Sequence, residues 1–153
     1  MTIFVDLNHG HDKVTGKSIT DLIGLLGSTP INWYAKWQSA VMTLTFGAEF
    51  TSLKRAAEEA IVYWYFFRSF GMRVTKPTII YEDNISVVLS SSNPDSTLQH
   101  KSMALSYYFA REHVSGEVAE IQKVHVSQNI ADALTKGLDS SGFRNYSMPI
   151  IHN

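Results

Sequence analysis

The sequence contains no cysteine. This absence excludes disulfide bonds, thiolate metal sites and a cysteine nucleophile, and it fits an intracellular protein. The sequence also lacks a run of about 20 apolar residues, which a membrane-spanning helix needs. Its first residues lack the basic start and the apolar segment of a signal peptide. We therefore expect an intracellular protein that neither crosses a membrane nor relies on thiol chemistry.

The chain has little excess charge of either sign, because its formal net charge is −1. The overall balance therefore gives no sign of nucleic-acid binding, which would need a local basic patch or metal ions that neutralise phosphates. A length of 153 residues with 44% hydrophobic residues suits one domain with a substantial core. We expect this domain at residues 1–139. Residues 140–153 form a C-terminal tail without a clear pattern.

Hydrophobic periodicity predicts an α/β domain. The pattern begins with three strands, continues with a long helix, and then alternates between strands and helices. Such an order favours a mixed sheet, with an antiparallel meander of three strands and helices on both faces. The expected strands are 2–7, 17–26, 31–37, 78–81 and 118–126, and the expected helices are 47–70, 85–89, 102–114 and 129–138, with a loop at 90–96.

Four acidic residues lie where predicted strands end or predicted helices begin. Asp6 and Asp83 follow apolar strands, and Glu49 and Asp132 fall in the first turns of helices. Buried carboxylates are costly without a compensating partner, and a divalent cation can serve several at once. Because the chain offers oxygen ligands and no cysteine, Mg²⁺ or Mn²⁺ is favoured over zinc. The pattern thus indicates one shared metal site.

Simpler interpretations exist for each acid alone. Asp83 can belong to an ordinary turn at a strand end. Glu49 and Asp132 can be favoured by the helix dipole, which contributes about 0.3 to 1 kcal/mol.

Two other clusters also have simple interpretations. The histidines at 9–12 are expected in a solvated loop. The five aromatics at 63–67 belong mainly to the core, but they cannot all face one side of a helix. Some of these rings therefore remain for a partner surface.

Four motifs in order resemble the ribonuclease H domain of reverse transcriptases from copia-type retrotransposons. They are Phe4-Val5-Asp6, Gly47-Ala48-Glu49-Phe50, Tyr81-Glu82-Asp83-Asn84 and Ile130-Ala131-Asp132-Ala133-Leu134-Thr135-Lys136. Segments 27–33, 36–38 and 107–112 are similar as well, so the resemblance runs from about Ile3 to Leu138. It implies a ribonuclease H-like fold, in which a five-stranded mixed sheet joins a three-stranded antiparallel meander to two parallel strands.

The resemblance also implies an activity, namely endonucleolytic hydrolysis of the RNA strand of an RNA/DNA hybrid during reverse transcription. Two Mg²⁺ or Mn²⁺ ions would be held by the catalytic residues Asp6, Glu49, Asp83 and Asp132. Expected nucleic-acid contacts are Lys36, Gln38, Asn84 and Lys101. The expected partners are the hybrid and the polymerase region of the same polyprotein, in the cytoplasm or inside virus-like particles.

The chain departs from the copia-type pattern at several positions. Ser102 follows Lys101 where the family carries a Lys-His pair, Tyr108 replaces a histidine, and Leu44 replaces a serine. His125, a candidate for proton transfer or product release, falls inside a predicted strand. Two alternatives therefore stay open. One is a catalytically weak or silent module that docks on nucleic acid or the polymerase, and the other is a different nuclease or transposase of the same fold.

Overall fold

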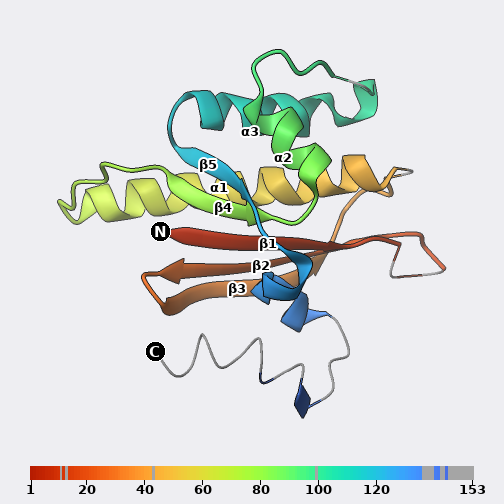
Figure 1. Cartoon of the computed structure of the whole chain (residues 1–153), viewed down its shortest axis with the longest axis horizontal. Coiled ribbons are helices and arrows are strands. Elements are labelled where there is room, and N and C mark those ends of the chain that lie inside the picture. Colours follow the sequence, from red (N-terminus) through yellow and green to blue (C-terminus); the bar gives the residue numbers. More distant parts are fainter. Residues whose placement is uncertain are drawn as a thin grey trace.

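The computed structural model describes residues 1–10, 12, 14–42, 44–98, 100–135, 140, 141 and 144. Strands, α-helices and 3₁₀-helices (η) alternate along the described chain (Figure 1). Their bounds are β1 Thr2–Asn8, β2 Ile19–Leu26, β3 Thr29–Trp37, α1 Thr45–Ser69, β4 Thr78–Glu82, α2 Ile85–Ser92, η1 Lys101–Met103, α3 Ala104–Ser115, β5 Ala119–Lys123, η2 Val126–Gln128 and η3 Ile130–Leu134. Within these residues, no helix combines the length and the apolar character needed to cross a membrane.

The strands form one five-stranded mixed sheet in the order β3-β2-β1-β4-β5. β1, β2 and β3 pair antiparallel, whereas β4 pairs parallel with both β1 and β5. Gly27, with φ of 64°, makes the tight turn between β2 and β3, because this left-handed conformation is strained for other residues. The predicted meander of three strands followed by two parallel strands is confirmed.

The two faces of the sheet have different neighbours. Val5 and Leu22, which lie opposite each other on β1 and β2, belong to the core that packs against α1. Side chains alternate along a strand, so the next pair, Asp6 and Asp21, points to the other face. There η3 contacts β1 and β2. Helices therefore cover both faces, and the sheet edge at Asp6 lies between α1 and η3.

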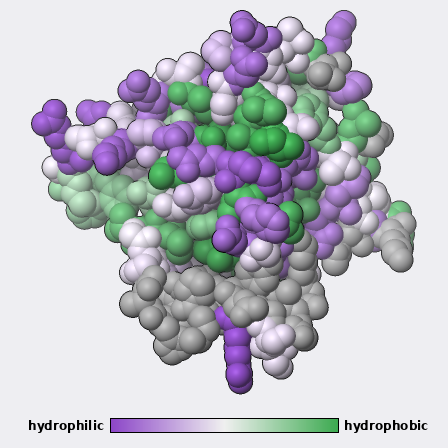
Figure 2. Space-filling model, viewed as in Figure 1, coloured by the Kyte–Doolittle hydropathy of each residue, from purple (hydrophilic) through white to green (hydrophobic). Residues whose placement is uncertain are grey.

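The main core lies between the sheet and α1. Small residues on α1, among them Ala57 and Ala60, are fully or almost fully buried and let the helix approach the sheet closely. Phe50 is also fully buried, and its ring centroid lies 5.4 Å from that of Tyr107 on α3. These contacts fix the start of α1 against the sheet. On the face in Figure 2, apolar and hydrophilic groups are interspersed.

Several predicted boundaries were wrong. α1 begins at Thr45, so Glu49 lies in its second turn, where a dipole contribution is weaker. α2 continues to Ser92, so residues 90–92 are helical instead of part of a loop. β5 ends at Lys123, which places His125 outside the strand, at the N-cap of η2. The last helix is the 3₁₀-helix η3, with Asp132 in its first turn as predicted.

Some predictions fall on residues that the structure does not describe. These are the end of the predicted last helix at 136–138, His11 in the polar loop, and the tail apart from residues 140, 141 and 144. The proposed boundary between the domain and the tail at residue 139 therefore stays a prediction.

Candidate metal and active site

Two of the predicted ligands emerge at the same edge of the sheet. Phe4 on β1 lies opposite Tyr81 on the parallel strand β4. Asp6 and Asp83 each follow two residues later, beyond the carboxyl end of this parallel pairing. Because α/β folds bind ligands at the carboxyl ends of their strands, this edge is the expected place for a site.

Three carboxylates gather here. Glu49, Glu82 and Asp83 each offer an oxygen within 4.8 Å of the others. Glu49 comes from α1, whereas Glu82 and Asp83 come from the end of β4. The structure thus brings together two predicted ligands, Glu49 and Asp83, and adds Glu82. Asp6 and Asp132 are not part of this mutual group among the described residues.

Glu82 was missed by the sequence analysis. It is fully buried, and its Oε1 accepts a hydrogen bond of 3.0 Å from the Asn84 backbone N–H. Its Oε2 is also buried and has no hydrogen-bond partner among the described residues. Strand alternation was the available signal, since Ile80 lies in the core beneath α1 and Glu82 follows two positions later.

The environment of Glu82 disfavours its charged form. Its pKa is raised well above the ordinary value of 4.5, mainly by burial and then by the negative charge of Glu49. The Asn84 N–H opposes this shift, whereas Asp83 and Asp6 add to it. A cation beside these acids would offset both the burial and the mutual repulsion. The donor set, made of oxygens only, suits a hard divalent cation such as Mg²⁺ or Mn²⁺.

Gln38 sets the position of the α1 start. Its Nε2 donates to the Ala48 carbonyl and to Thr20 Oγ1, both at 3.0 Å. The side chain is only 6% exposed. The Gln38 amide is thus engaged in the interior, and its predicted contact with nucleic acid stays a prediction. In this position, Gln38 ties the residue before Glu49 to β2.

The segment that carries Asp132 is anchored beside Asp6. Asn129 Nδ2 donates to the Val5 carbonyl at 2.9 Å, and Asn129 Oδ1 caps η3 by accepting from the Ala131 N–H at 3.3 Å. Asp132 itself is buried. These bonds place the backbone of η3 against the end of β1, where Asp6 follows Val5.

The other expected nucleic-acid contacts are Lys36 on β3, Asn84 before α2 and Lys101 in η1. Lys36 and Lys101 are exposed. Asn84 caps α2, with its Oδ1 accepting from the Ser86 N–H at 3.0 Å. A hollow of about 370 Å³ lies between the starts of α1 and α2, and it is lined by Leu44, Thr45, Phe46, Ser86, Ser90 and His100.

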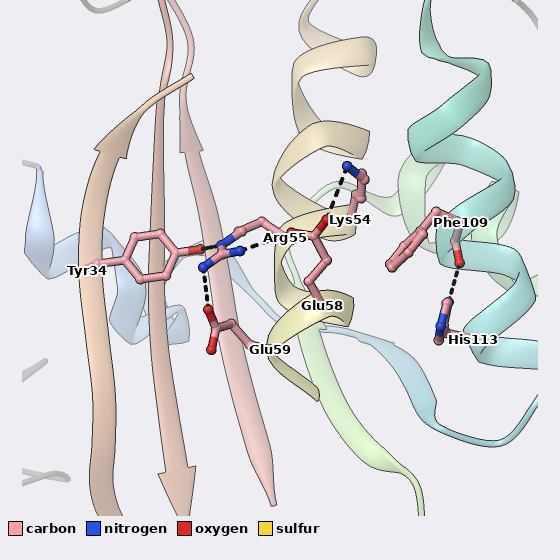
Figure 3. Close-up of polar contacts among 7 residues, drawn as sticks. All are labelled: Tyr34, Lys54, Arg55, Glu58, Glu59, Phe109 and His113. Atoms are coloured by element: carbon pink, nitrogen blue, oxygen red, sulfur yellow. Dashed lines mark hydrogen bonds and ion pairs between the residues drawn. The ribbon is translucent and has the colours of Figure 1, made fainter. Parts of the chain in front are cut away.

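Further along α1, Arg55 belongs to a network that links the helix to β3 (Figure 3). Its guanidinium donates to the Tyr34 hydroxyl at 3.0 Å and pairs with Glu58 at 3.1 Å and Glu59 at 2.6 Å. Burial raises the pKa of Tyr34 to about 12, although the charge of Arg55 opposes this. Arg55 is therefore occupied by protein groups and serves the helix–sheet contact.

Sequence relatives are Pol polyproteins. The chain is 29% identical over 147 residues to the retrovirus-related Pol polyprotein from transposon RE1 of Arabidopsis thaliana. It is 30% identical over 133 residues to that from transposon RE2 of the same plant. The alignments cover 96% and 87% of this chain, but only 10% and 9% of those polyproteins. No family model matches the chain.

Solved structures with the same fold include the N-terminal ribonuclease H domain of a Mycobacterium tuberculosis protein. That match has a TM-score of 0.63 and 15% identity, and it covers 96% of this chain and 95% of the other. Ribonuclease H1 from Halobacterium salinarum matches with a TM-score of 0.60 and 16% identity, over 87% of this chain and 92% of that one. The prototype foamy virus protease-reverse transcriptase matches with a TM-score of 0.55 and 11% identity, over 97% of this chain and 20% of that one.

The comparisons agree with the motif order and with the sheet topology. The structural matches share the ribonuclease H fold, and the sequence matches are transposon Pol polyproteins. The chain therefore has a ribonuclease H-like fold, and its sequence is similar to about a tenth of the retrovirus-related Pol polyproteins from transposons RE1 and RE2.

Proposed function

We propose that this domain is a divalent-metal-dependent ribonuclease H that cuts the RNA strand of RNA/DNA hybrids during reverse transcription of a retrotransposon. The observation that carries the proposal is the group of Glu49, Glu82 and Asp83, whose carboxylate oxygens lie within 4.8 Å of one another. In a ribonuclease H fold, such a group at the carboxyl ends of parallel strands suits hydrolysis of a phosphodiester.

The acids have two kinds of role in the proposal. Asp6, Glu49, Asp83 and Asp132 would hold two Mg²⁺ or Mn²⁺ ions. When bound, such ions supply positive charge to the attacking water and to the departing ribose oxygen. The buried Glu82 would fix the backbone after Asp83, because its Oε1 accepts a hydrogen bond from the Asn84 N–H. No nucleophilic side chain is required, so the expected products carry 5′-phosphate and 3′-hydroxyl ends.

The surroundings of the acids support a nucleic-acid substrate. A hollow is lined by residues from the first turns of α1, which carries Glu49, and of α2, which begins two residues after Asp83, and helix N-termini favour phosphate groups. The exposed Lys36 and Lys101 would contact the backbone of the hybrid, and Asn84 would reach a base edge or sugar. Selection of a hybrid over duplex DNA requires contacts to 2′-hydroxyls in the minor groove.

The proposal extends to the setting of the domain. The chain spans about a tenth of the length of its curated relatives. We infer that it works beside the polymerase region of a polyprotein, in the cytoplasm or inside virus-like particles. Both inferences rest on the sequence similarity to Pol polyproteins from transposons.

A cleavage assay tests the activity. A fluorescent RNA/DNA hybrid is incubated with the domain, with and without Mg²⁺, and with Asp83→Asn. The exposed Asp95→Asn is the matched control. We expect Mg²⁺-dependent RNA cleavage by the wild type and the control, and almost complete loss with Asp83→Asn. Absence of cleavage by the wild type would point to a silent docking module, and cleavage of DNA to another nuclease.

A further inference from the structure

The last turns of α1 and the turn after them expose a group of apolar side chains that we call the α1-end surface. It consists of Val62, Tyr65, Phe66, Phe70 and Met72, which are 58%, 65%, 52%, 68% and 48% exposed. The helical members recur at steps of three and four residues, so they share one side of the helix. The rings of Phe66 and Phe70 lie 4.9 Å apart. Such a contiguous exposed patch indicates an interaction site.

This surface lies far from the candidate active site. Figure 1 shows the end of α1 extending beyond the neighbouring strands, and Figure 2 shows apolar atoms at the same left-hand end. Glu49 and Phe70 are separated by about 30 Å along the helix at 1.5 Å per residue. A partner bound at Phe70 would therefore leave the group of Glu49, Glu82 and Asp83, which we call the acidic edge, open to a substrate.

Two arginines border the α1-end surface. Arg68 stacks over the Trp64 ring, with its guanidinium 4.2 Å from the ring centroid, and Arg73 follows in the next turn. Both line a hollow of about 390 Å³ together with Gly71, Met72 and Val74. Neither arginine forms an ion pair within the described parts of the chain. The complementary partner is therefore apolar at its centre and acidic at its rim.

Met1 lies close to the second half of α1, which carries this surface. Met1 and Tyr63 both approach Gly24 on β2. A Cβ added at Gly24 would lie 3.3 Å from Met1 Cε and 3.2 Å from the Tyr63 hydroxyl, so Met1 lies next to the second half of α1. A segment that packs against Met1 would therefore also lie beside the second half of α1. The relatives carry about nine-tenths of their length outside the matched region, and the viral protease-reverse transcriptase carries about four-fifths outside it.

We propose that the α1-end surface docks the polymerase region of the same polyprotein, through Phe66 and Phe70 at the centre and Arg68 and Arg73 at the rim. This rests on the proposed function for the identity of the partner. The contact orients the domain so that the acidic edge points away from the interface. A linked partner held close by the chain needs only modest intrinsic affinity, because linkage raises its effective concentration.

The test uses the domain and the separately produced polymerase region of its polyprotein, with binding followed by sedimentation velocity and calorimetry. The variant is Phe66→Ser with Phe70→Ser. The matched control is Leu105→Ser with Tyr108→Ser on α3, where the side chains are 85% and 59% exposed. We expect at least tenfold weaker binding for the variant, binding within twofold of the wild type for the control, and unchanged thermal unfolding of each isolated domain.

Three results would overturn the docking proposal. They are equal losses in both variants, no binding by the wild type at 0.1 mM, and a wild-type domain that dimerises through Phe66 and Phe70. Hybrid cleavage by the isolated domain is measured in parallel. Because the α1-end surface lies outside the acidic edge, docking can fail while cleavage persists, and cleavage can fail while docking persists.

Discussion

The side chain of Asn129 donates a hydrogen bond of 2.9 Å to the backbone carbonyl of Val5, across 124 positions of the sequence. Asp6 follows Val5, and Asp132 lies three residues after Asn129. Asn129 is fully buried. The bond therefore joins the two backbone segments that carry Asp6 and Asp132. It also gives the Val5 carbonyl a hydrogen-bond donor.

Asn129→Ala should lower the free energy of unfolding by about 1–3 kcal/mol, the usual cost of a buried polar group left without its partner. It should also weaken Mn²⁺ binding, because η3 loses its anchor on β1. Chemical denaturation and calorimetric titration measure the two effects. The control is Asn93→Ala, where an exposed amide caps a turn. Mn²⁺ affinity equal to that of the wild type would show that Asp132 is placed without Asn129.

Glu82→Gln should stabilise the metal-free protein at neutral pH. The folded-state pKa of Glu82 is raised above 4.5. The contribution of the Glu82 side chain to the free energy of unfolding is therefore complete below pH 4.5. The contribution is then lost as pH rises through the folded-state pKa. The variant has no such loss, so its advantage in urea unfolding with EDTA should grow from pH 4.5 to pH 8.

The same substitution should weaken Mn²⁺ binding about 10- to 100-fold, the usual effect of altering a group beside metal ligands. Glu120→Gln, at an exposed position on β5, is the control for both measurements. Parallel stability curves for Glu82→Gln and the wild type across this pH range would contradict the raised pKa of Glu82.

The sheet could be predicted from the sequence because each strand ends in a recognisable signal. Gly27 marks the hairpin, Pro77 precedes β4, and polar residues follow Val5 and Tyr81. The expectation that Asp6 and Asp83 lie at the same end of the sheet required only that β1 and β4 be parallel neighbours, which holds. Among the described residues, the mutual carboxylate group contains Asp83 and not Asp6. Local pattern and strand direction were sufficient for this part.

Other features depend on contacts between distant segments. Gln38 reads as a polar residue after an edge strand, yet the start of α1 folds over it and its amide turns inward to Ala48. Glu82 was overlooked because Asp83 beside it matched the motif, although burial by α1 affects Glu82 more. The last helix is a short 3₁₀-helix, which a period of 3.6 residues does not distinguish over five positions.

Gln38→Ala should destabilise the fold by about 1–3 kcal/mol, since Ala48 and Thr20 lose a buried donor. Its effect on hybrid affinity should be small when measured below the unfolding transition. Lys36→Ala, at the exposed neighbour on β3, should show the opposite result, with weaker hybrid binding and little change in stability. Fluorescence anisotropy and urea unfolding separate the two. Equal losses of hybrid affinity in both variants would identify Gln38 as a direct contact.

Tyr34 should be among the last tyrosines to ionise. Burial raises its pKa to about 12, while Arg55 lowers it by charge and hydrogen bonding. Because the folded-state pKa exceeds the ordinary value of 10.0, the stability that Tyr34 contributes is retained below pH 10 and lost as pH approaches 12. Tyr34→Phe should remove the latest step in an ultraviolet titration of tyrosinate, and Arg55→Met should move that step to higher pH. A Tyr34 step at pH 10 would show that the hydroxyl is open to solvent and that the link between α1 and β3 is not formed.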